Sequence, residues 1–266
     1  MGLFKFNEKD YFVHEFSDRK RRCVKLSEFK RFNPDVLGLG EINVKAERKE
    51  VVCAIFDLSG FTDFCKQIDP RLAIPAFLSG YLNWFFDTLR DCFVDKRTDS
   101  DGGGVALYSD PPFFCKFMGD GLLLLWDAEN LNAIPMHNII GICATICSKY
   151  KKEFIKTTSK TMAYLPARLR CGIARGDVYG VGNGSDFVGP CINLASRLQK
   201  LGPLSFVVSK RGFDFNEHLD ESMTKLFTLQ SAVVRGIGNQ ELIYILTEEL
   251  PLLNREDRKI IRRLMK

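Results

Sequence analysis

The sequence predicts an α+β fold, a ferredoxin-like βαββαβ core whose central, mainly antiparallel sheet is flanked by helices. Three observations carry this prediction. The run Val51–Phe56 is apolar throughout, as in a fully buried strand. Residues 70–93 repeat apolar side chains mostly every three or four positions, as in a helix. Two short apolar runs, 113–118 and 122–126, flank Gly119-Asp120-Gly121, as in a hairpin with a tight turn.

The remaining elements follow the same patterns. A short helix is expected after the turn Leu58-Ser59-Gly60. Helical spacing recurs over 130–156 and 191–201, and apolar runs predict strands over 169–181 and 205–208. Later strands near 227–234 and 242–246 extend the sheet.

The 266 residues divide into three expected parts. Residues 1–48 are charge-rich without a clear period and form an N-terminal extension, favoured as a solvated arm or short helix over a nucleic-acid or membrane contact. Residues 49–248 form one catalytic domain, and 249–266 end in a basic helix on the surface.

Composition narrows the function classes. A net charge of +5 suits a polyanionic small molecule better than a nucleic acid. Nine scattered cysteines without a C-x-x-C pair indicate neither a zinc site nor a disulfide framework, and favour a reducing cytoplasm. No apolar run is long enough to cross a membrane, and the N-terminus lacks the pattern of a signal peptide. We therefore expect a cytoplasmic protein that contacts neither nucleic acid nor membrane.

Two aspartates occupy strand ends. Asp57 follows the first buried strand, and Asp120 lies in the turn of the hairpin. In a βαββ core the first strand lies beside that hairpin, so both carboxylates can converge on one edge. Hard oxygen ligands are what Mg²⁺ or Mn²⁺ requires, and two such ions roughly 3.5–4 Å apart catalyse phosphoryl transfer. Taken alone, either aspartate would be better explained as a turn residue.

Three sequence blocks resemble the motifs of class III adenylyl and guanylyl cyclases. Phe56-Asp57-Leu58-Ser59-Gly60-Phe61-Thr62 resembles the first metal motif, and Lys116-Phe117-Met118-Gly119-Asp120 the second. The block 186–197 resembles the D-x-x-G-x-x-x-N-x-A-x-R segment. Their order and spacing make this signal more specific than a single glycine motif. The likeness extends over about residues 51–246.

The resemblance implies a role for each matching residue. Two divalent metal ions are bound by Asp57 and Asp120, with the Leu58 carbonyl as a further ligand. Lys116 and Asp186 match the positions that contact the base. It also implies a homodimer, in which each of two composite sites combines the metal aspartates of one subunit with the Asn/Arg pair of the other.

Phosphate and ribose contacts complete the expected site. The resemblance implies that Asn193 orients the ribose, that Arg197 supports charge on the α-phosphate, and that Arg235 replaces a triphosphate-binding lysine. Asn193 and Arg197 are four residues apart and share a helix face, which suits joint action. The backbone amides of Ser59, Gly60, Phe61 and Thr62, at a helix N-terminus, can hold the β- and γ-phosphates.

Phe56 bears on the choice of base. Common cyclases place a small residue before the first metal aspartate, and a phenylalanine there could narrow the pocket and favour a pyrimidine. Alternatively, Phe56 turns into the core, since the strand is apolar on both faces. The compact chain also resembles the stand-alone pyrimidine cyclases of bacterial Pycsar anti-phage systems, whose cyclic product activates a separate effector.

The expected reaction is therefore conversion of a pyrimidine nucleoside triphosphate, UTP before CTP, to its 3′,5′-cyclic monophosphate and pyrophosphate. An adenylate cyclase is the main alternative, because Lys116 and Asp186 also match the pair that recognises adenine. Two further classes stay open: an inactive cyclase-like module that binds nucleotide, and another metal-dependent phosphoryl-transfer enzyme. The Asn193/Arg197 pair favours cyclisation over polymerisation.

Overall fold

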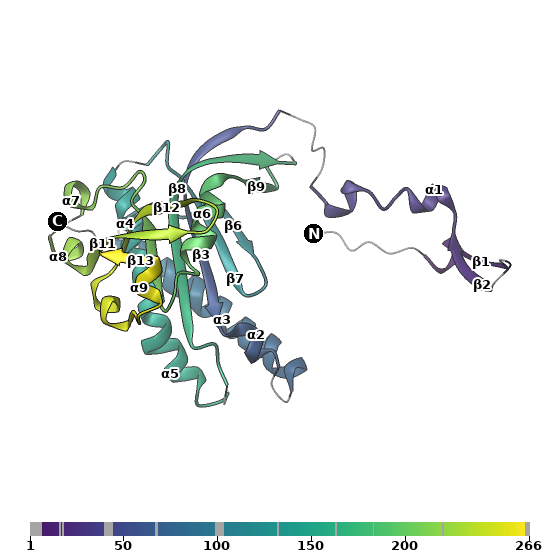
Figure 1. The fold of residues 1–266 in the computed structure, drawn as a ribbon, viewed down its shortest axis with the longest axis horizontal. Coiled ribbons are helices and arrows are strands. Elements are labelled where there is room, and N and C mark those ends of the chain that lie inside the picture. Colours follow the sequence, from purple (N-terminus) through teal and green to yellow (C-terminus); the bar gives the residue numbers. More distant parts are fainter. Residues whose placement is uncertain are drawn as a thin grey trace. The chain divides into compact units, whose positions relative to one another are not determined.

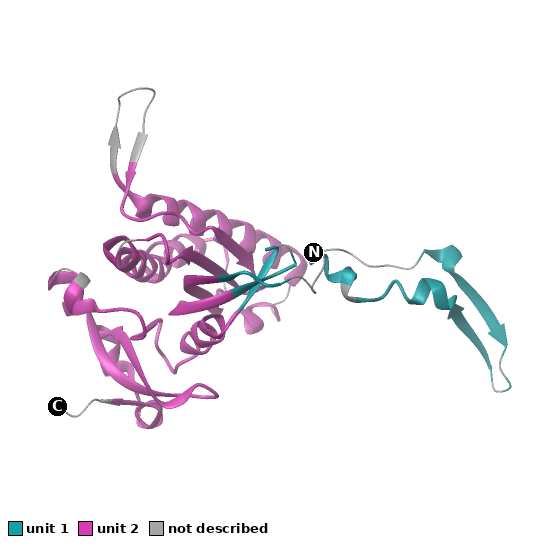
Figure 2. Ribbon diagram, turned by 90° about the horizontal axis from the view of Figure 1, so that it is seen from above, with its two compact units in different colours: residues 1–48, 179–188 teal, residues 49–178, 189–266 magenta. Residues whose placement is uncertain are grey.

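A computed structural model (Figure 1) describes residues 7–15, 17, 19–39, 45–66, 69–98, 104–131, 133–162, 164–182, 184–219 and 221–263. The chain divides into two compact units (Figure 2). The first comprises residues 1–48 and 179–188, and the second comprises residues 49–178 and 189–266. The second unit contains most of the residues expected to act on a substrate.

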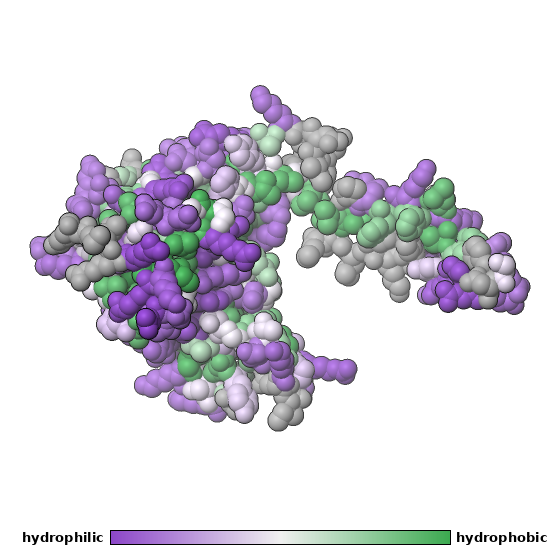
Figure 3. All heavy atoms as spheres, in the orientation of Figure 1, coloured by the Kyte–Doolittle hydropathy of each residue, from purple (hydrophilic) through white to green (hydrophobic). Residues whose placement is uncertain are grey.

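The first unit is built around an antiparallel hairpin that the sequence analysis did not anticipate. A 3-10 helix, η1 (Glu8–Asp10), leads into β1 (Tyr11–Glu15), which pairs with β2 (Lys20–Val24). Two short helices follow, α1 (Leu26–Phe29) and η2 (Pro34–Leu37). Large apolar side chains of this unit are exposed (Figure 3), and those between residues 7 and 39 are Phe12, Val13, Leu26, Phe29, Phe32 and Leu37.

The main sheet has the strand order β13-β11-β12-β10-β8-β3-β7-β6, with β9 paired to β8. The strands are β3 (Arg48–Ser59), β6 (Phe114–Phe117), β7 (Gly121–Asp127), β8 (Arg168–Val181), β9 (Asp186–Val188), β10 (Phe206–Ser209), β11 (Phe227–Val234), β12 (Gly238–Leu246) and β13 (Ile261–Arg263). The β3–β7, β6–β7, β8–β9, β10–β12, β11–β12 and β11–β13 pairs are antiparallel, and β8–β10 is parallel. The predicted α+β fold with a central, mainly antiparallel sheet is confirmed.

One face of this sheet carries a large apolar core. Alternate residues of β3, including Phe56, pack there with side chains of α3 (Pro70–Phe93) and α4 (Ala133–Lys149). The short helix α2 (Phe61–Phe64) also contributes a buried phenylalanine. After α4 the helix continues as a π-helix, η4 (Tyr150–Phe154), and then as α5 (Ile155–Thr158).

The opposite face is covered by α6 (Pro190–Leu198). On β8, Cys171 and Ile173 belong to the core on the α3 side, so Gly172 between them faces the other way. A side chain at Gly172 would collide with the backbone of α6, which shows how closely the helix approaches. Beyond the sheet lie α7 (Phe215–His218), α8 (Glu221–Leu226) and a hairpin of β4 (Val94–Thr98) with β5 (Gly104–Leu107).

The C-terminal prediction was wrong in part. Residues 249–266 were expected to end in a basic helix, but the helical segments here are short: η5 (Thr247–Leu252) and α9 (Asp257–Ile260). The chain then forms β13, which pairs with β11 and buries Ile261. Burial of this apolar side chain explains why the segment joins the sheet rather than remaining a surface helix. Residues 264–266 lie outside the described part.

Candidate active site

The two predicted metal aspartates lie side by side at one end of the sheet. Asp57 is near the end of β3 and pairs in register with Gly121, the residue after Asp120. The Leu58 N–H donates to the Asp120 carbonyl at 3.0 Å, which ties the end of β3 to the β6–β7 turn. The structure thus brings together Asp57, Leu58 and Asp120, as the sequence predicted.

Glycines make this close approach possible. A side chain at Gly121 would collide with the backbone of Phe56, so only glycine lets β7 pair with β3 here. Gly119 has a φ of +100°, which favours glycine, and the Met118 N–H closes the turn on the Gly121 carbonyl at 2.9 Å. The Gly-Asp-Gly sequence therefore presents Asp120 at the tip of a tight hairpin.

Phe56 turns into the core, which is the second of the two orientations that the sequence left open. Its side chain is 0% exposed and belongs to the core, where its ring meets Phe85 of α3 edge-on at 4.9 Å. Because successive strand residues point to opposite faces, Asp57 faces away from this core. Phe56 therefore does not line the candidate site in this chain, and its ring does not narrow a nucleotide pocket there.

Arg170 is a site residue that the sequence analysis missed. Its Nε and Nη2 atoms donate to a single oxygen of Asp57, Oδ2, at 3.2 and 2.5 Å. The two side chains are only 20% and 14% exposed. A signal was present, because Arg170 and Arg168 alternate with the buried residues Leu169 and Cys171 along β8, so both arginines belong to the face opposite the core.

The donor set fits divalent metal ions. Asp57 and Asp120 supply carboxylate oxygens on rigid backbone, and Leu58 follows Asp57 in the chain and is bonded through its N–H to the Asp120 carbonyl. Arg170 places a positive charge directly on Asp57, as a bound cation would. Across the described residues, no group of three or more His, Cys, Asp or Glu side chains could hold a metal. A metal at this site would therefore rely on two carboxylates supplemented by backbone and substrate oxygens.

The segment after Asp57 was expected to hold phosphates through its amides. Ser59 ends β3, Gly60 adopts a φ of +89°, and Phe61 and Thr62 begin α2. The Phe61 ring packs on Phe64 at 5.6 Å, so this side chain is directed to the protein. Binding of phosphates by these four backbone amides stays a prediction.

Cys65 follows α2 and is electrostatically coupled to the site. Partial burial raises the pKa of the Cys65 thiol, and the negative charge of Asp120 raises it further. The thiol is therefore held in its neutral form close to a carboxylate of the candidate site.

The predicted transition-state residues form a separate group. Asn193 and Arg197 are exposed on one face of α6. A side chain at Gly236 would collide with the Arg197 guanidinium, so Arg197 lies against the β11–β12 turn that also carries the exposed Arg235. Within the described part of the chain, the side chains of Asn193 and Arg197 have no hydrogen bond or ion pair, including with Asp57 or Asp120. One chain therefore presents two distinct groups of candidate residues.

Several solved structures of other proteins share this fold. No family model matches the sequence, and no curated protein matches it. Among solved structures, the adenylyl cyclase CyaB from P. aeruginosa superposes with a TM-score of 0.55 at 16% identity, over 80% of this chain and 99% of that one. The guanylyl cyclase Cya2 gives 0.55 at 17% identity, over 76% of this chain and 94% of that one. The chain has the class III nucleotidyl cyclase fold.

A third solved structure agrees. The guanylyl cyclase domain of the RhoGC fusion protein from the aquatic fungus Blastocladiella emersonii, solved as a monomeric double mutant, gives a TM-score of 0.50 at 18% identity. The match covers 76% of this chain and 98% of the fungal domain. Among the described helices of this cyclase fold, none is long and apolar enough to cross a membrane.

The expected base-contacting pair of this cyclase fold belongs to two different units. Lys116 is on β6 of the second unit, opposite Leu123 of β7, and is exposed. Asp186 opens β9 in the first unit, where it pairs with Val181 and its Oδ1 accepts from the Phe187 N–H at 2.9 Å. Joint contact of Lys116 and Asp186 with a base stays a prediction.

Proposed function

We propose that this protein is a nucleotidyl cyclase that converts a nucleoside triphosphate to its 3′,5′-cyclic monophosphate and pyrophosphate. The observation that carries the proposal is the fixed pairing of Asp57 and Asp120, held by the Asp57–Gly121 register and the Leu58–Asp120 hydrogen bond. This pairing occurs on a fold that solved adenylyl and guanylyl cyclases share. Two hard carboxylates on adjacent rigid elements suit metal-assisted phosphoryl transfer.

In the proposed reaction the 3′-oxygen of the ribose attacks the α-phosphorus, its proton passes to solvent, and the bond to the pyrophosphate oxygen breaks. The metal ions would lower the pKa of the attacking hydroxyl and neutralise charge on the phosphates. Asp57 and Asp120 would hold those ions, with the Leu58 carbonyl. The guanidinium fork of Arg197 would bind α-phosphate oxygens, and the Asn193 amide would orient the ribose.

We propose a homodimer with composite sites. Asn193 and Arg197 are exposed and make no side-chain hydrogen bonds to other described residues of their own chain, so they are available to a nucleotide bound by another subunit. Among the described residues, neither side chain forms a hydrogen bond or ion pair with Asp57 or Asp120. In the proposed homodimer, the aspartates of one subunit and the Asn/Arg pair of its partner complete each site.

For the base we propose a pyrimidine, with UTP as substrate and Lys116 and Asp186 as its contacts. This choice now rests on the resemblance to the Pycsar cyclases alone, because Phe56 lies in the core. The same resemblance leads us to propose a role in bacterial anti-phage defence, with a separate effector that binds the cyclic product. ATP and CTP are the competing substrates, giving cyclic AMP or cyclic CMP.

The test is incubation of the purified chain with ATP, GTP, CTP and UTP in the presence of Mn²⁺, with products identified by mass spectrometry. A cyclic monophosphate is expected, and the nucleotide that yields it identifies the base. Asp120→Asn should abolish the product, whereas Asp91→Asn, at an exposed position of α3, should leave it unchanged. Nucleotide binding without any cyclic product would instead support an inactive nucleotide-binding module and refute the enzyme.

A further inference from the structure

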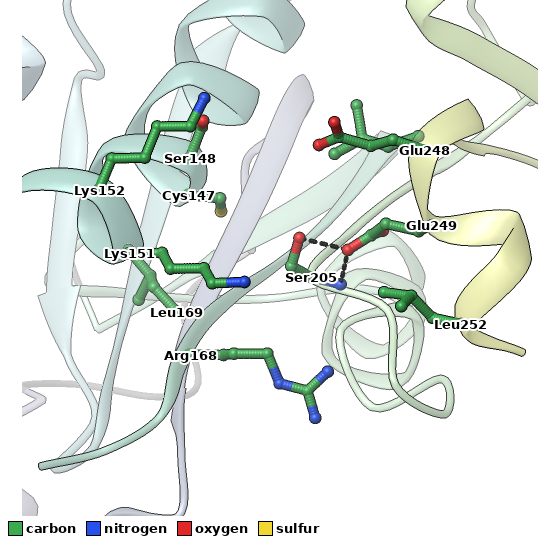
Figure 4. A pocket seen from close by; sticks show the side chains of 11 residues that line it. Cys147, Ser148, Lys151, Lys152, Arg168, Leu169, Ser205, Glu248, Glu249 and Leu252 are labelled. Carbon is green, nitrogen blue, oxygen red and sulfur yellow. Dashed lines mark hydrogen bonds between the residues drawn. The ribbon is translucent and has the colours of Figure 1, made fainter. Parts of the chain in front are cut away.

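A cavity of about 500 Å³ with both polar and apolar walls lies outside the candidate active site. Its walls come from the end of α4 and η4, the start of β8, the segment before β10, and η5 (Figure 4). It is lined by none of the residues assigned to metal, ribose or phosphate binding. Its volume is within the usual range for pockets that bind small molecules, about 300–1,000 Å³.

Three cationic side chains line this cavity, those of Lys151, Lys152 and Arg168. Figure 4 shows the Lys151 amine and the Arg168 guanidinium reaching into the same space as Ser205. Arg168 is oriented by a hydrogen bond from Nη1 to the Pro203 carbonyl, which leaves its other N–H groups available. Considering only residues with described positions, neither lysine forms an ion pair.

The acidic side chains of the cavity do not neutralise these cations. Glu249 is 6% exposed, and its Oε1 accepts from the Ser205 N–H at 2.8 Å and from Ser205 Oγ at 2.6 Å. Burial raises the pKa of the Glu249 carboxyl; the bonds from Ser205 oppose this rise, and the charge of Glu248 adds to it. Only Glu248, which is exposed, supplies a second carboxyl. The cavity is therefore net positive.

The backbone that presents the lysines is itself unusual. Lys151 and Lys152 belong to the π-helix η4, which interrupts an otherwise α-helical segment. π-helical turns account for well under 1% of residues and occur frequently at functional sites. Lys151 on this turn extends toward the space that Arg168 also enters, whereas the Lys152 amine points toward Ser148 (Figure 4). A lysine and an arginine that enter one space from opposite walls suit an anion.

We propose that this cavity binds a small phosphate-bearing anion. Lys151 and Arg168 would contact the phosphate oxygens, and Lys152, whose amine lies near Ser148, would add positive charge to the wall. The Ser148 and Ser205 side chains would complete the polar wall. The side chains of Leu169, Leu246 and Leu252 form an apolar part of the wall, against which an organic group attached to the phosphate could pack. The ligand is therefore inorganic phosphate, pyrophosphate or a mononucleotide, which share this chemistry.

The test is isothermal titration calorimetry of the full chain at about 0.15 M ionic strength, without metal ion or nucleoside triphosphate. The probes are inorganic phosphate, pyrophosphate and the 3′,5′-cyclic monophosphates. The Lys151→Gln/Lys152→Gln double variant is expected to weaken binding of the tightest probe at least tenfold, and Arg168→Gln should have a similar effect. The probe that binds tightest distinguishes the free anions from a nucleotide.

Two controls make the result decisive. Lys156→Gln removes an exposed lysine from α5 outside the cavity and should bind like the unaltered protein. Arg197→Ala removes a proposed phosphate contact of the active site and should also leave this binding intact. Unchanged binding in the Lys151/Lys152 variant, or equal loss in the Lys156 control or in Arg197→Ala, would overturn the proposal, as would no binding of any probe. Thermal unfolding of each variant verifies that it is folded, and the exposed lysine positions keep the test valid if Arg168→Gln does not fold.

Discussion

Arg170 donates two hydrogen bonds to the same carboxylate oxygen of Asp57, from Nε at 3.2 Å and from Nη2 at 2.5 Å. This pair joins β8 to the neighbouring strand β3, near the end of β3 that is hydrogen-bonded to Asp120. An arginine here compensates the charge of a carboxylate that is only 14% exposed. Any cation that uses Asp57 Oδ2 must therefore compete with Arg170.

This competition predicts that Arg170→Gln binds Mn²⁺ more tightly than the unaltered protein. Hydrogen bonds to charged groups contribute about 1.5–3 kcal/mol, so their loss should raise Mn²⁺ affinity by about tenfold or more. Titration followed by electron paramagnetic resonance, without nucleotide, measures this directly. Arg175→Gln is the matched control, because Arg175 on the same strand bonds Glu50 of β3 at 2.8 Å outside the site. Equal Mn²⁺ affinity in both variants would contradict the prediction.

The sequence predicted that Asp57 and Asp120 lie close together because local signals and topology agreed there. The apolar run ending at Asp57 and the Gly-Asp-Gly turn each specify their element, and strand order then brings the two aspartates together. Arg170 was missed because a strand's side-chain contacts depend on which strand lies beside it. That neighbour is β3, whose pairing with β8 follows from the whole sheet.

The side chain of Phe56 illustrates a different limit. A strand that is apolar on both faces gives no alternation from which to assign an orientation, so the sequence left two possibilities open. In the structure the Phe56 ring packs against Phe85 in the core, so the orientation toward the core is the one that this chain adopts. The π-helix η4 was missed for a related reason, since apolar spacing near 3.6 continues through it and one wider turn leaves no clear mark in the sequence.

A substitution at Gly236 would test the role of Arg197 without changing the arginine itself. Gly236 has a φ of +72°, and a side chain there would collide with the Arg197 guanidinium. Gly236→Ala should therefore destabilise the fold by about 1 kcal/mol and displace Arg197, which lowers kcat on the order of 100-fold. Gly238→Ala is the control, because a side chain at Gly238 meets nothing within 4 Å. Activity measured alongside thermal unfolding separates the two effects, and equal kcat in both variants would argue against a role for Arg197 placement.

Glu249 predicts a pH dependence of stability. Burial raises the pKa of its carboxyl above the ordinary value of 4.5, so the folded state binds a proton more tightly than the unfolded state. This contribution to stability is present below pH 4.5 and is lost as pH rises through the raised pKa of the folded protein. Unfolding free energies from denaturant titrations across this range should show a decline that Glu249→Gln removes. Glu248→Gln should keep most of it, since burial of Glu249 is unchanged; a decline that persists in Glu249→Gln would refute the assignment.

Composite sites predict complementation between two inactive variants. Asp120→Asn removes a proposed metal ligand, and Arg197→Ala removes the proposed phosphate contact of the other group, so each homodimer should be inactive. In a mixed dimer, one site combines both defects, while the other combines the intact aspartates of the Arg197→Ala chain with the intact Arg197 of its partner. After subunit exchange about half of the dimers are mixed and each has one working site, so activity should recover to about one quarter of the unaltered protein. Recovery is measured as cyclic nucleotide formed after mixing. If all of a site came from one chain, both kinds of subunit would stay inactive in every dimer, and mixing would restore nothing.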